Sequence, residues 1–444
     1  MKWKVKKGPI LLPLLLAAAI LVGIAVFTRL SRETSAEHTD LGQKYLNELN
    51  YSGAVEQFLE SLSLDPMDAS ARLGLAQAYL GMEETEQVPQ VLQPLTDSGN
   101  PDAYRLLAQA QMEEQDVDAA LLTAQSLVER TDNEEDYAMR DELLGQVLVQ
   151  PHSIAQGTDQ VLVLLDSTVY SAGRNTLGQL GTPQGLATDI VQESVLPAGF
   201  SGQPSRVYCA GRTSYVVDQD GNLWAAGENR WGQMGLGYAS ATPKAGWSRL
   251  TDSGDVAAVA GTAGSLLVLK LDGSLWYAGQ GGVLTLERMA QFYTVSAIAS
   301  YGDTAAVLTA DGTLYEADGS DLSAWSRVAQ KVKQFSLGQG GLVWVTADNL
   351  LGSQQGYAAP DGWTTGEDGA TPSFRVRQAA SDGRGLLLLD GDGMLHRLYN
   401  GTLYDLEESA QCVYSAGEWA VAEGDGGLQL WNLSQSFPQN TPSF

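Results

Sequence analysis

The chain has 444 residues, 49 of them glycine, and its 26 basic and 53 acidic side chains give a formal charge of −27. The length predicts two or three domains, and the 44% of hydrophobic residues can form a sizeable core, which excludes a wholly disordered chain. The acidity excludes a generic DNA-binding protein, because phosphate binding needs clustered lysines and arginines. Two cysteines exclude a disulfide-stapled scaffold and a cysteine-rich metal domain.

The amino-terminal segment has the pattern of a membrane anchor. Residues 1–32 carry six basic side chains and no acidic one, and they contain an uncharged run of 18 residues from Ile10 to Phe27. As a helix this run would be about 27 Å long, close to the ~30 Å hydrocarbon core of a bilayer. The positive-inside bias predicts a cytoplasmic tail (1–8), a transmembrane signal anchor (9–30) and an extracytoplasmic bulk at the cell membrane. The alternative is a signal peptide that is cleaved near residues 34–36.

Residues 37–150 are strongly acidic and show a helical repeat. Residues 33–150 hold 24 acidic and five basic side chains. The first repeat is defined by its small, aromatic and helix-ending positions, namely Leu41, Gly42, Tyr45, Ala54, Phe58 and Pro66. The pattern returns from Leu75, 34 residues later, and in a degenerate form from Leu107. It resembles the tetratricopeptide repeat, a helix–turn–helix unit in which small residues let the two helices approach closely. Residues 134–149 are expected to form a capping helix.

Two roles remain open for this repeat. Such arrays present a concave groove to an extended peptide or a partner helix. A short array can also be a spacer that holds the next domain away from the membrane. A groove with this charge would favour a basic or zwitterionic partner.

Residues 152–444 repeat a β-hairpin phrase. An apolar strand, a two-residue turn and a second strand recur, with turns at 166–167, 220–221, 272–273, 311–312, 348–349, 392–393 and 425–426. Asp-Gly at five of these turns favours a type I′ hairpin. Seven units at intervals of 33–54 residues predict an all-β, seven-bladed propeller.

Two blades carry a more specific motif. Gly173-Arg-Asn-Thr-Leu-Gly-Gln-Leu-Gly181 and Gly227-Glu-Asn-Arg-Trp-Gly-Gln-Met-Gly235 lie 54 residues apart. They resemble the repeat of the regulator of chromosome condensation family, in which this element is a tight loop after an aromatic strand. The family's founder exchanges nucleotide on a small GTPase and binds chromatin, whereas secreted bacterial relatives bind proteins through propeller loops. The predicted anchor and acidity favour the second precedent.

The sequence shows no catalytic signature. It contains no His-Glu-x-x-His, Cys-x-x-Cys, Gly-x-Ser-x-Gly or Walker motif, so we expect neither an enzyme nor a cofactor nor a metal site. Cys209 and Cys412 are expected to be free, because their positions in the ring are too far apart for a disulfide.

Loop aromatics are the best candidates for ligand contact. They are Trp231, Tyr238, Trp247, Trp325 and Trp363. Such side chains suit a protein interface or a sugar platform, although covering gaps between blades is an alternative role for them.

We therefore expect a membrane-anchored, non-catalytic binding or scaffold protein. Its propeller loops would recognise a protein or a glycan, and its helical repeat would be a second binding site or a stalk. Nucleic acid is not an expected partner. The alternative is a cell-surface propeller hydrolase or lyase that acts on wall polymer.

Overall fold

A computed structural model describes residues 34–131, 133–182, 188–194, 196, 200, 203–319, 321–366, 368–424 and 427–432. The chain divides into two compact units, one of Met1–Glu114 with Glu129–Asp132 and one of Gln115–Val128 with Asn133–Phe444. The predicted anchor lies outside the described residues. No helix within the described ranges is both long and apolar enough to span a bilayer.

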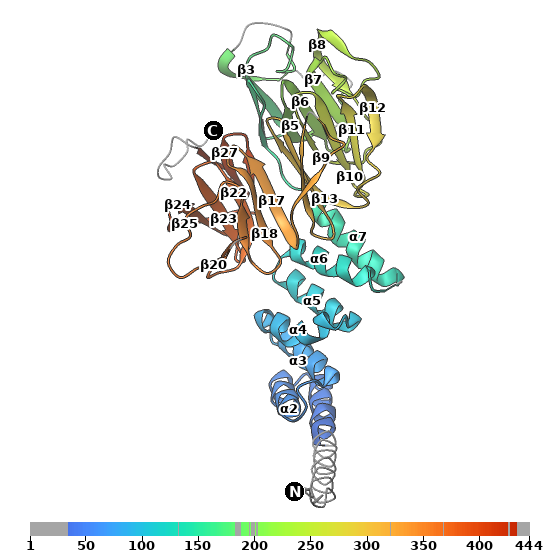
Figure 1. Cartoon of the computed structure of the whole chain (residues 1–444), viewed down its shortest axis with the longest axis vertical. Coiled ribbons are helices and arrows are strands. Elements are labelled where there is room, and N and C mark those ends of the chain that lie inside the picture. Colours follow the sequence, from blue (N-terminus) through green and yellow to red (C-terminus); the bar gives the residue numbers. More distant parts are fainter. Residues whose placement is uncertain are drawn as a thin grey trace, which may run out of the picture. The chain divides into compact units, whose positions relative to one another are not determined.

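The first unit is helical (Figure 1). A helix over residues 34–47 is followed by α2 (Tyr51–Leu64), α3 (Ala69–Gly81), the 3-10 helix η1 (Thr85–Gln87), α4 (Val88–Asp97) and α5 (Pro101–Glu113). The helix ends are local in origin, because side chains of Asn50, Asp68 and Asn100 accept hydrogen bonds from the first backbone amides of α2, α3 and α5.

Phe58 explains the small residues of the first repeat. Its buried ring lies between Gly42 and Gly74, where an added Cβ would come within 2.7 and 2.2 Å of ring atoms. Ala54 is buried beside it, and α2 ends at Leu64, before Pro66. The predicted helical repeat is therefore confirmed in this segment.

The second unit contains two helices and seven antiparallel sheets. Its helices are α6 (Val117–Val128) and α7 (Glu134–Leu148). The first three sheets are β1 (Ile154–Gln156), β2 (Gln160–Leu165), β3 (Thr168–Gly173) and β4 (Thr188–Glu193); β5 (Pro204–Ala210), β6 (Thr213–Asp218), β7 (Leu223–Asn229) and β8 (Ser240–Arg249); and β9 (Val256–Gly261), β10 (Ser265–Lys270), β11 (Leu275–Gly279) and β12 (Val283–Arg288).

The other four sheets are β13 (Val295–Tyr301), β14 (Thr304–Thr309), β15 (Leu314–Asp318) and β16 (Ser326–Ala329); β17 (Val332–Gly338), β18 (Gly341–Thr346), β19 (Leu351–Ser353), β20 (Thr364–Gly366) and β21 (Gly369–Thr371); β22 (Val376–Ser381), β23 (Gly385–Asp390), β24 (Met394–Tyr399) and β25 (Thr402–Ser409); and β26 (Cys412–Ala416), β27 (Trp419–Gly424) and β28 (Gly427–Asn432). Of these, the fifth sheet of the ring departs from sequence order because β21 lies between β19 and β20, and the last has three described strands.

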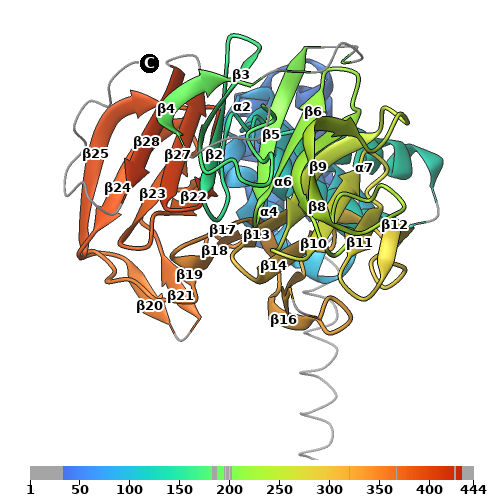
Figure 2. The same cartoon turned by 90° about the horizontal axis from the view of Figure 1, so that it is seen from above.

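The seven sheets close into a ring, which confirms the seven-bladed propeller. The first strand of each blade contacts the first strand of the next, and β26 of the last blade returns to β1. Figure 2 shows β27 and β28 of the last blade beside β2 of the first. Side chains of both blades share a buried cluster at this junction, including Ile154 and Val421.

Antiparallel order gives the ring two distinct faces. Connections between first and second strands, and between third and fourth strands, lie on one face, which we call the loop face. Turns between second and third strands lie on the other, which we call the helix face because α6 and α7 pack there. An added Cβ at Gly273 would lie 3.3 Å from Leu144 of α7, and one at Gly312 would lie 2.7 Å from Leu122 of α6.

The helix-face turns differ from the predicted type I′ geometry. At the four described Asp-Gly turns only the glycine has a positive φ, for example 77° at Gly221, and among the described turns both central residues are positive at Asp166-Ser167 alone. The predicted turn at 425–426 lies outside the described residues. Asp218 N donates to Asn222 O, and Gly221 N donates to Asp218 O. These are type I turns closed by a left-handed glycine, because the blades use three-residue loops at these positions.

The helices α6 and α7 belong to the propeller's core. Leu121, Leu143 and Leu148 are buried in one cluster with Leu269 and Val295 of the third and fourth blades. The compact unit therefore begins at Gln115, whereas composition placed the start of the propeller after Pro151. The helical pattern is local, and the partner that buries its apolar face is far along the chain.

Candidate functional site

Three of the five candidate aromatics are packing residues. Trp247 and Trp363 are buried, and the indole nitrogen of Trp247 donates to Ser194 Oγ at 3.0 Å. Trp325 packs edge-on against Phe292 and donates to the carbonyl of Leu322 at 2.7 Å. Trp247 and Trp363 have little surface left for a ligand, whereas Trp325 is only partly buried, and a role of these three side chains in ligand contact stays a prediction.

Trp231 and Tyr238 are exposed to 49% and 44% on the loop face. Both belong to the connection between β7 and β8 of the second blade. Their role in ligand contact stays a prediction, and they mark the exposed aromatic surface of the loop face.

The repeated glycine–glutamine loops are held by matching hydrogen bonds. In the second blade, Asn229 Oδ1 accepts from Met234 N and Gln233 Oε1 accepts from Trp231 N. In the first blade, Asn175 and Gln179 accept in the same way from Leu180 N and Leu177 N.

Each glutamine also forms a hydrogen bond with a connection between the first and second strands of a blade. The amide nitrogen of Gln179 donates to Asp159, and that of Gln233 donates to the carbonyl of Ala263 in the third blade. Both glutamines are fully buried, so the motif residues position the loops and do not themselves offer a contact surface.

Three arginines lie in loop-face connections of the first two blades, and Arg230 directly precedes Trp231. Arg174 and Arg212 both face Asp159, with Nε–Oδ2 distances of 3.7 and 3.4 Å. Arg230 faces Glu228, with an Nε–Oε1 distance of 3.6 Å. We call Arg174, Arg212, Arg230, Trp231 and Tyr238 the arginine–aromatic strip. Sequence reasoning missed the arginines, although each follows or lies near a loop-face glycine.

A cavity of about 190 Å³ occupies the propeller axis. Its walls are side chains of the first strands, many of them alanine, valine or serine, and its helix-face end is lined by Val147, Leu148 and His152. The His152 ring stacks between Tyr208 and Tyr414 with centroid distances of 4.5 Å, and its Nδ1 lies 2.7 Å from Val207 O. Burial lowers the pKa of His152 to about 4, so the ring is neutral near pH 7.

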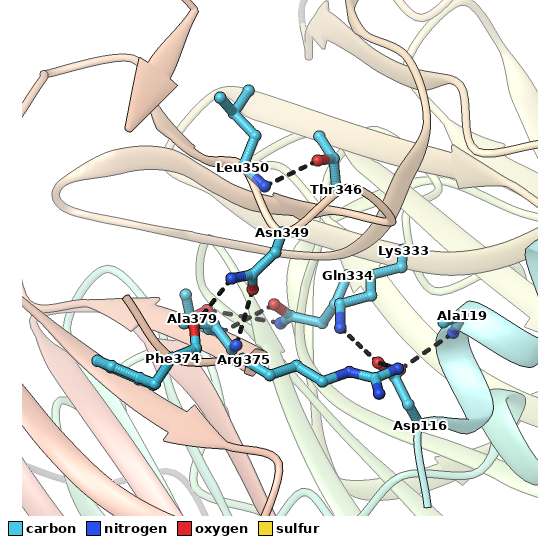
Figure 3. Close-up of polar contacts among 11 residues, drawn as sticks. Asp116, Ala119, Lys333, Gln334, Thr346, Asn349, Leu350, Phe374, Arg375 and Ala379 are labelled. Carbon is cyan, nitrogen blue, oxygen red and sulfur yellow. Dashed lines mark hydrogen bonds and ion pairs between the residues drawn. The ribbon is translucent and has the colours of Figure 1, made fainter. Parts of the chain in front are cut away.

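Asp116 ties α6 to two blades at the helix-face end (Figure 3). Its buried carboxylate accepts from Lys333 Nζ at 2.6 Å and from Arg375 Nη2 at 2.9 Å. It also accepts from Ala119 N at 3.1 Å, which caps α6. We call Asp116, Lys333 and Arg375 the hub. Its role is structural, because two cations already neutralise the Asp116 carboxylate, which also caps the helix.

Asp118 is the unusual carboxyl of the cavity. Burial, and then the nearby charge of Asp116, raise its pKa to about 7, against the opposing influence of Lys333 and Arg377. It lines the cavity together with Lys333. Sequence reasoning missed this cluster, since its members are more than 200 residues apart.

The remaining chemistry of the described residues is sparse. Cys209 and Cys412 are free, as expected, and burial raises the pKa of each thiol to about 12. Within the described ranges, no group of three or more histidine, cysteine, aspartate or glutamate side chains could hold a metal ion.

Comparisons with known proteins find local similarity to proteins of the regulator of chromosome condensation type. No family model matches the chain. A protein RCC2 homolog of Danio rerio is 42% identical over 83 residues, 18% of this chain and 16% of that protein. One of Xenopus laevis is 36% identical over 97 residues, 21% of this chain and 18% of that protein. The chain thus spans less than a fifth of the length of these relatives.

Solved structures show the same kind of partial likeness. Human WBSCR16 has a TM-score of 0.49 and 17% identity, over 62% of this chain and 88% of that one. Prp20p of Saccharomyces cerevisiae has a TM-score of 0.43 and 17% identity, over 61% of this chain and 81% of that one. The local sequence similarity to the RCC2 homologs supports the predicted resemblance over about a fifth of the chain.

Proposed function

We propose that the chain is a membrane-anchored, extracytoplasmic and non-catalytic scaffold whose propeller recognises a protein through its loop face. The observation that carries the proposal is the pairing of exposed Trp231 and Tyr238 with exposed arginines on one face of an otherwise acidic molecule. Aromatic and arginine side chains are the residues that contribute most at protein interfaces. The helical repeat acts as a stalk or as a second binding site.

The pairing and accessibility of the charged side chains favour a binding function over a cell-surface enzyme. A hydrolase or lyase needs charged residues that converge on an accessible site. In the described part of the axial cavity, Lys333 is neutralised by Asp116, and Asp118 lies at the end covered by helices. The strip, in contrast, is open to solvent.

The binding surface can be tested with a matched pair of double variants. The full chain is used as bait for surface extracts, and captured proteins are identified by mass spectrometry. Trp231→Ala/Tyr238→Ala should lose a captured protein, whereas Leu271→Ala/Tyr293→Ala should retain it. Leu271 and Tyr293 are also exposed, but they lie on the helix face. Equal capture by both variants would refute the proposed surface, and capture by the unaltered chain that free glycan competes away would point to a glycan ligand.

The location is tested separately on intact cells that express the full chain with a carboxyl-terminal tag. External protease should remove the tag signal before the cells are permeabilised. Protection until permeabilisation would refute the extracytoplasmic location, whatever the strip binds.

A further inference from the structure

The arginine–aromatic strip belongs to the first two blades and reaches the third through Trp231. Asp159 of the first blade faces Arg174 of the same blade and Arg212 of the second. The backbone of Arg212 accepts from Glu228 N at 3.1 Å, and the Glu228 side chain faces Arg230, which precedes Trp231. An added Cβ on Gly264 of the third blade would lie 3.3 Å from Trp231, so the indole rests against that blade.

The guanidinium groups of the strip keep donors available. Their side chains are 55%, 45% and 61% exposed, while Asp159 and Glu228 are largely covered. The ion-pair distances of 3.4–3.7 Å exceed the 2.7–2.9 Å of a charge-assisted hydrogen bond. Three cations thus share two carboxylates in loose pairs. A planar guanidinium with free donors matches a carboxylate in two-pronged geometry.

Trp231 adds an apolar contact at one end of the strip. The neighbouring loop contains Gly281 and Gly282, and an added Cβ at either would meet no atom within 4 Å. The Trp231 side chain itself is 49% exposed, so its free surface can accept an apolar side chain of a partner.

The net charge of the chain favours a short acidic ligand over a long polyanion. A chain with a net charge of −27 repels a long polyanion, because a nucleic acid or a sulfated glycan brings continuous negative charge to the whole surface. A short acidic stretch of a polypeptide brings its carboxylates only to the strip. It also supplies the apolar side chain that Trp231 can contact.

We propose that the arginine–aromatic strip binds an acidic polypeptide segment that carries an apolar side chain. Its carboxylates pair with Arg174, Arg212 and Arg230, and its apolar side chain packs on Trp231. This proposal rests on the proposed binding function and names the chemistry of the partner.

The test uses the full chain labelled with 5-fluorotryptophan, with the Trp231 resonance assigned from Trp231→Phe. A synthetic peptide of repeated Glu-Glu-Leu units is titrated, and repeats of Gln-Gln-Leu and Lys-Lys-Leu serve as controls. The Glu-Glu-Leu peptide should shift the Trp231 resonance in a saturable way that weakens with salt, and the control peptides should not. Arg174→Gln/Arg212→Gln/Arg230→Gln should weaken binding by roughly tenfold or more.

A second triple variant controls for net charge. Arg288→Gln/Arg327→Gln/Arg384→Gln removes the same charge from exposed arginines elsewhere on the propeller and should leave the affinity nearly unchanged. An equal loss in both triples would overturn the proposal, as would tighter binding of a heparin oligosaccharide than of the acidic peptide at the strip. If the peptide fails but Trp231→Ala/Tyr238→Ala still abolishes capture of a protein, the partner's chemistry is wrong while the binding function stands.

Discussion

Replacing Asp116 by asparagine should strongly destabilise the propeller. The asparagine side-chain oxygen can still accept from Ala119 N and cap α6, so the change removes little besides the charge. Lys333 would then remain buried without its counterion, whereas Arg375, about one-third exposed, can turn to water. Breaking a buried ion pair by removing one partner costs about 3–5 kcal/mol. We expect a loss of about 3 kcal/mol in the free energy of unfolding, and about 1 kcal/mol more for Asp116→Ala, which also removes the cap.

Urea unfolding of the full chain followed by tryptophan fluorescence is a suitable assay, since nine of the ten tryptophans lie between residues 224 and 431. Asp116→Asn/Lys333→Met should recover most of the loss, because neither charge is then left alone. Lys331→Met is the matched control, since Lys331 pairs with Asp348 at 2.9 Å in an exposed position and should cost less than about 1 kcal/mol. A similar small cost for Asp116→Asn would refute the reasoning that the hub is buried and neutralised.

Three further predictions follow from the second unit. A chain that begins at Gln115 should unfold with the same fluorescence midpoint as the full chain, whereas one that begins at Gln150 should unfold at lower urea or aggregate, because Leu269 and Val295 lose the cover of α6 and α7. The pKa of Asp118 is raised to about 7, so folding favours its protonated form. The free energy of unfolding should therefore fall as the pH rises from about 4 to about 7, by no more than about 4 kcal/mol. Urea titrations at several pH values should show this fall, and Asp118→Asn should abolish it. Gln233→Leu should cost about 2 kcal/mol by thermal or urea unfolding, since it leaves Trp231 N and Ala263 O without their partner, and a cost near zero would contradict the account of the loop.

Local patterns in the sequence were sufficient for the architecture. Gly42, Ala54 and Phe58 are spaced for helix contact, and the structure packs them as that spacing implies. The hairpin phrase predicts seven blades because each blade is a local meander that closes only through its neighbours. The turn type was wrong in detail, since Asp-Gly also fits a type I turn followed by a left-handed glycine.

The site could be predicted only in part, because burial is a property of the closed ring. The local sequence does not separate Trp231, which is half exposed in a loop, from Trp247, which the structure places in β8 and buries with its indole nitrogen donating to Ser194. The contact of Asp116 with Lys333 joins positions 217 residues apart, and no spacing rule connects them. The arginines of the strip recur near glycines of the strand connections, and this pattern is visible in the sequence. It predicts a shared surface only when the antiparallel strand order, which places these connections on one face, is taken into account.

The two ends of the propeller axis divide stability from recognition. On the helix face, the buried carboxylate of Asp116 is fully engaged, because it accepts hydrogen bonds from Lys333, Arg375 and the backbone amide of Ala119. On the loop face, the buried glutamine side chains form hydrogen bonds with backbone groups of the loops, while Trp231 and the arginines remain exposed to solvent. A mutation at the helix face should therefore change the unfolding free energy with little change in affinity per folded molecule. One in the strip should do the reverse, so the two classes of variant can be separated by measuring both quantities on the same protein.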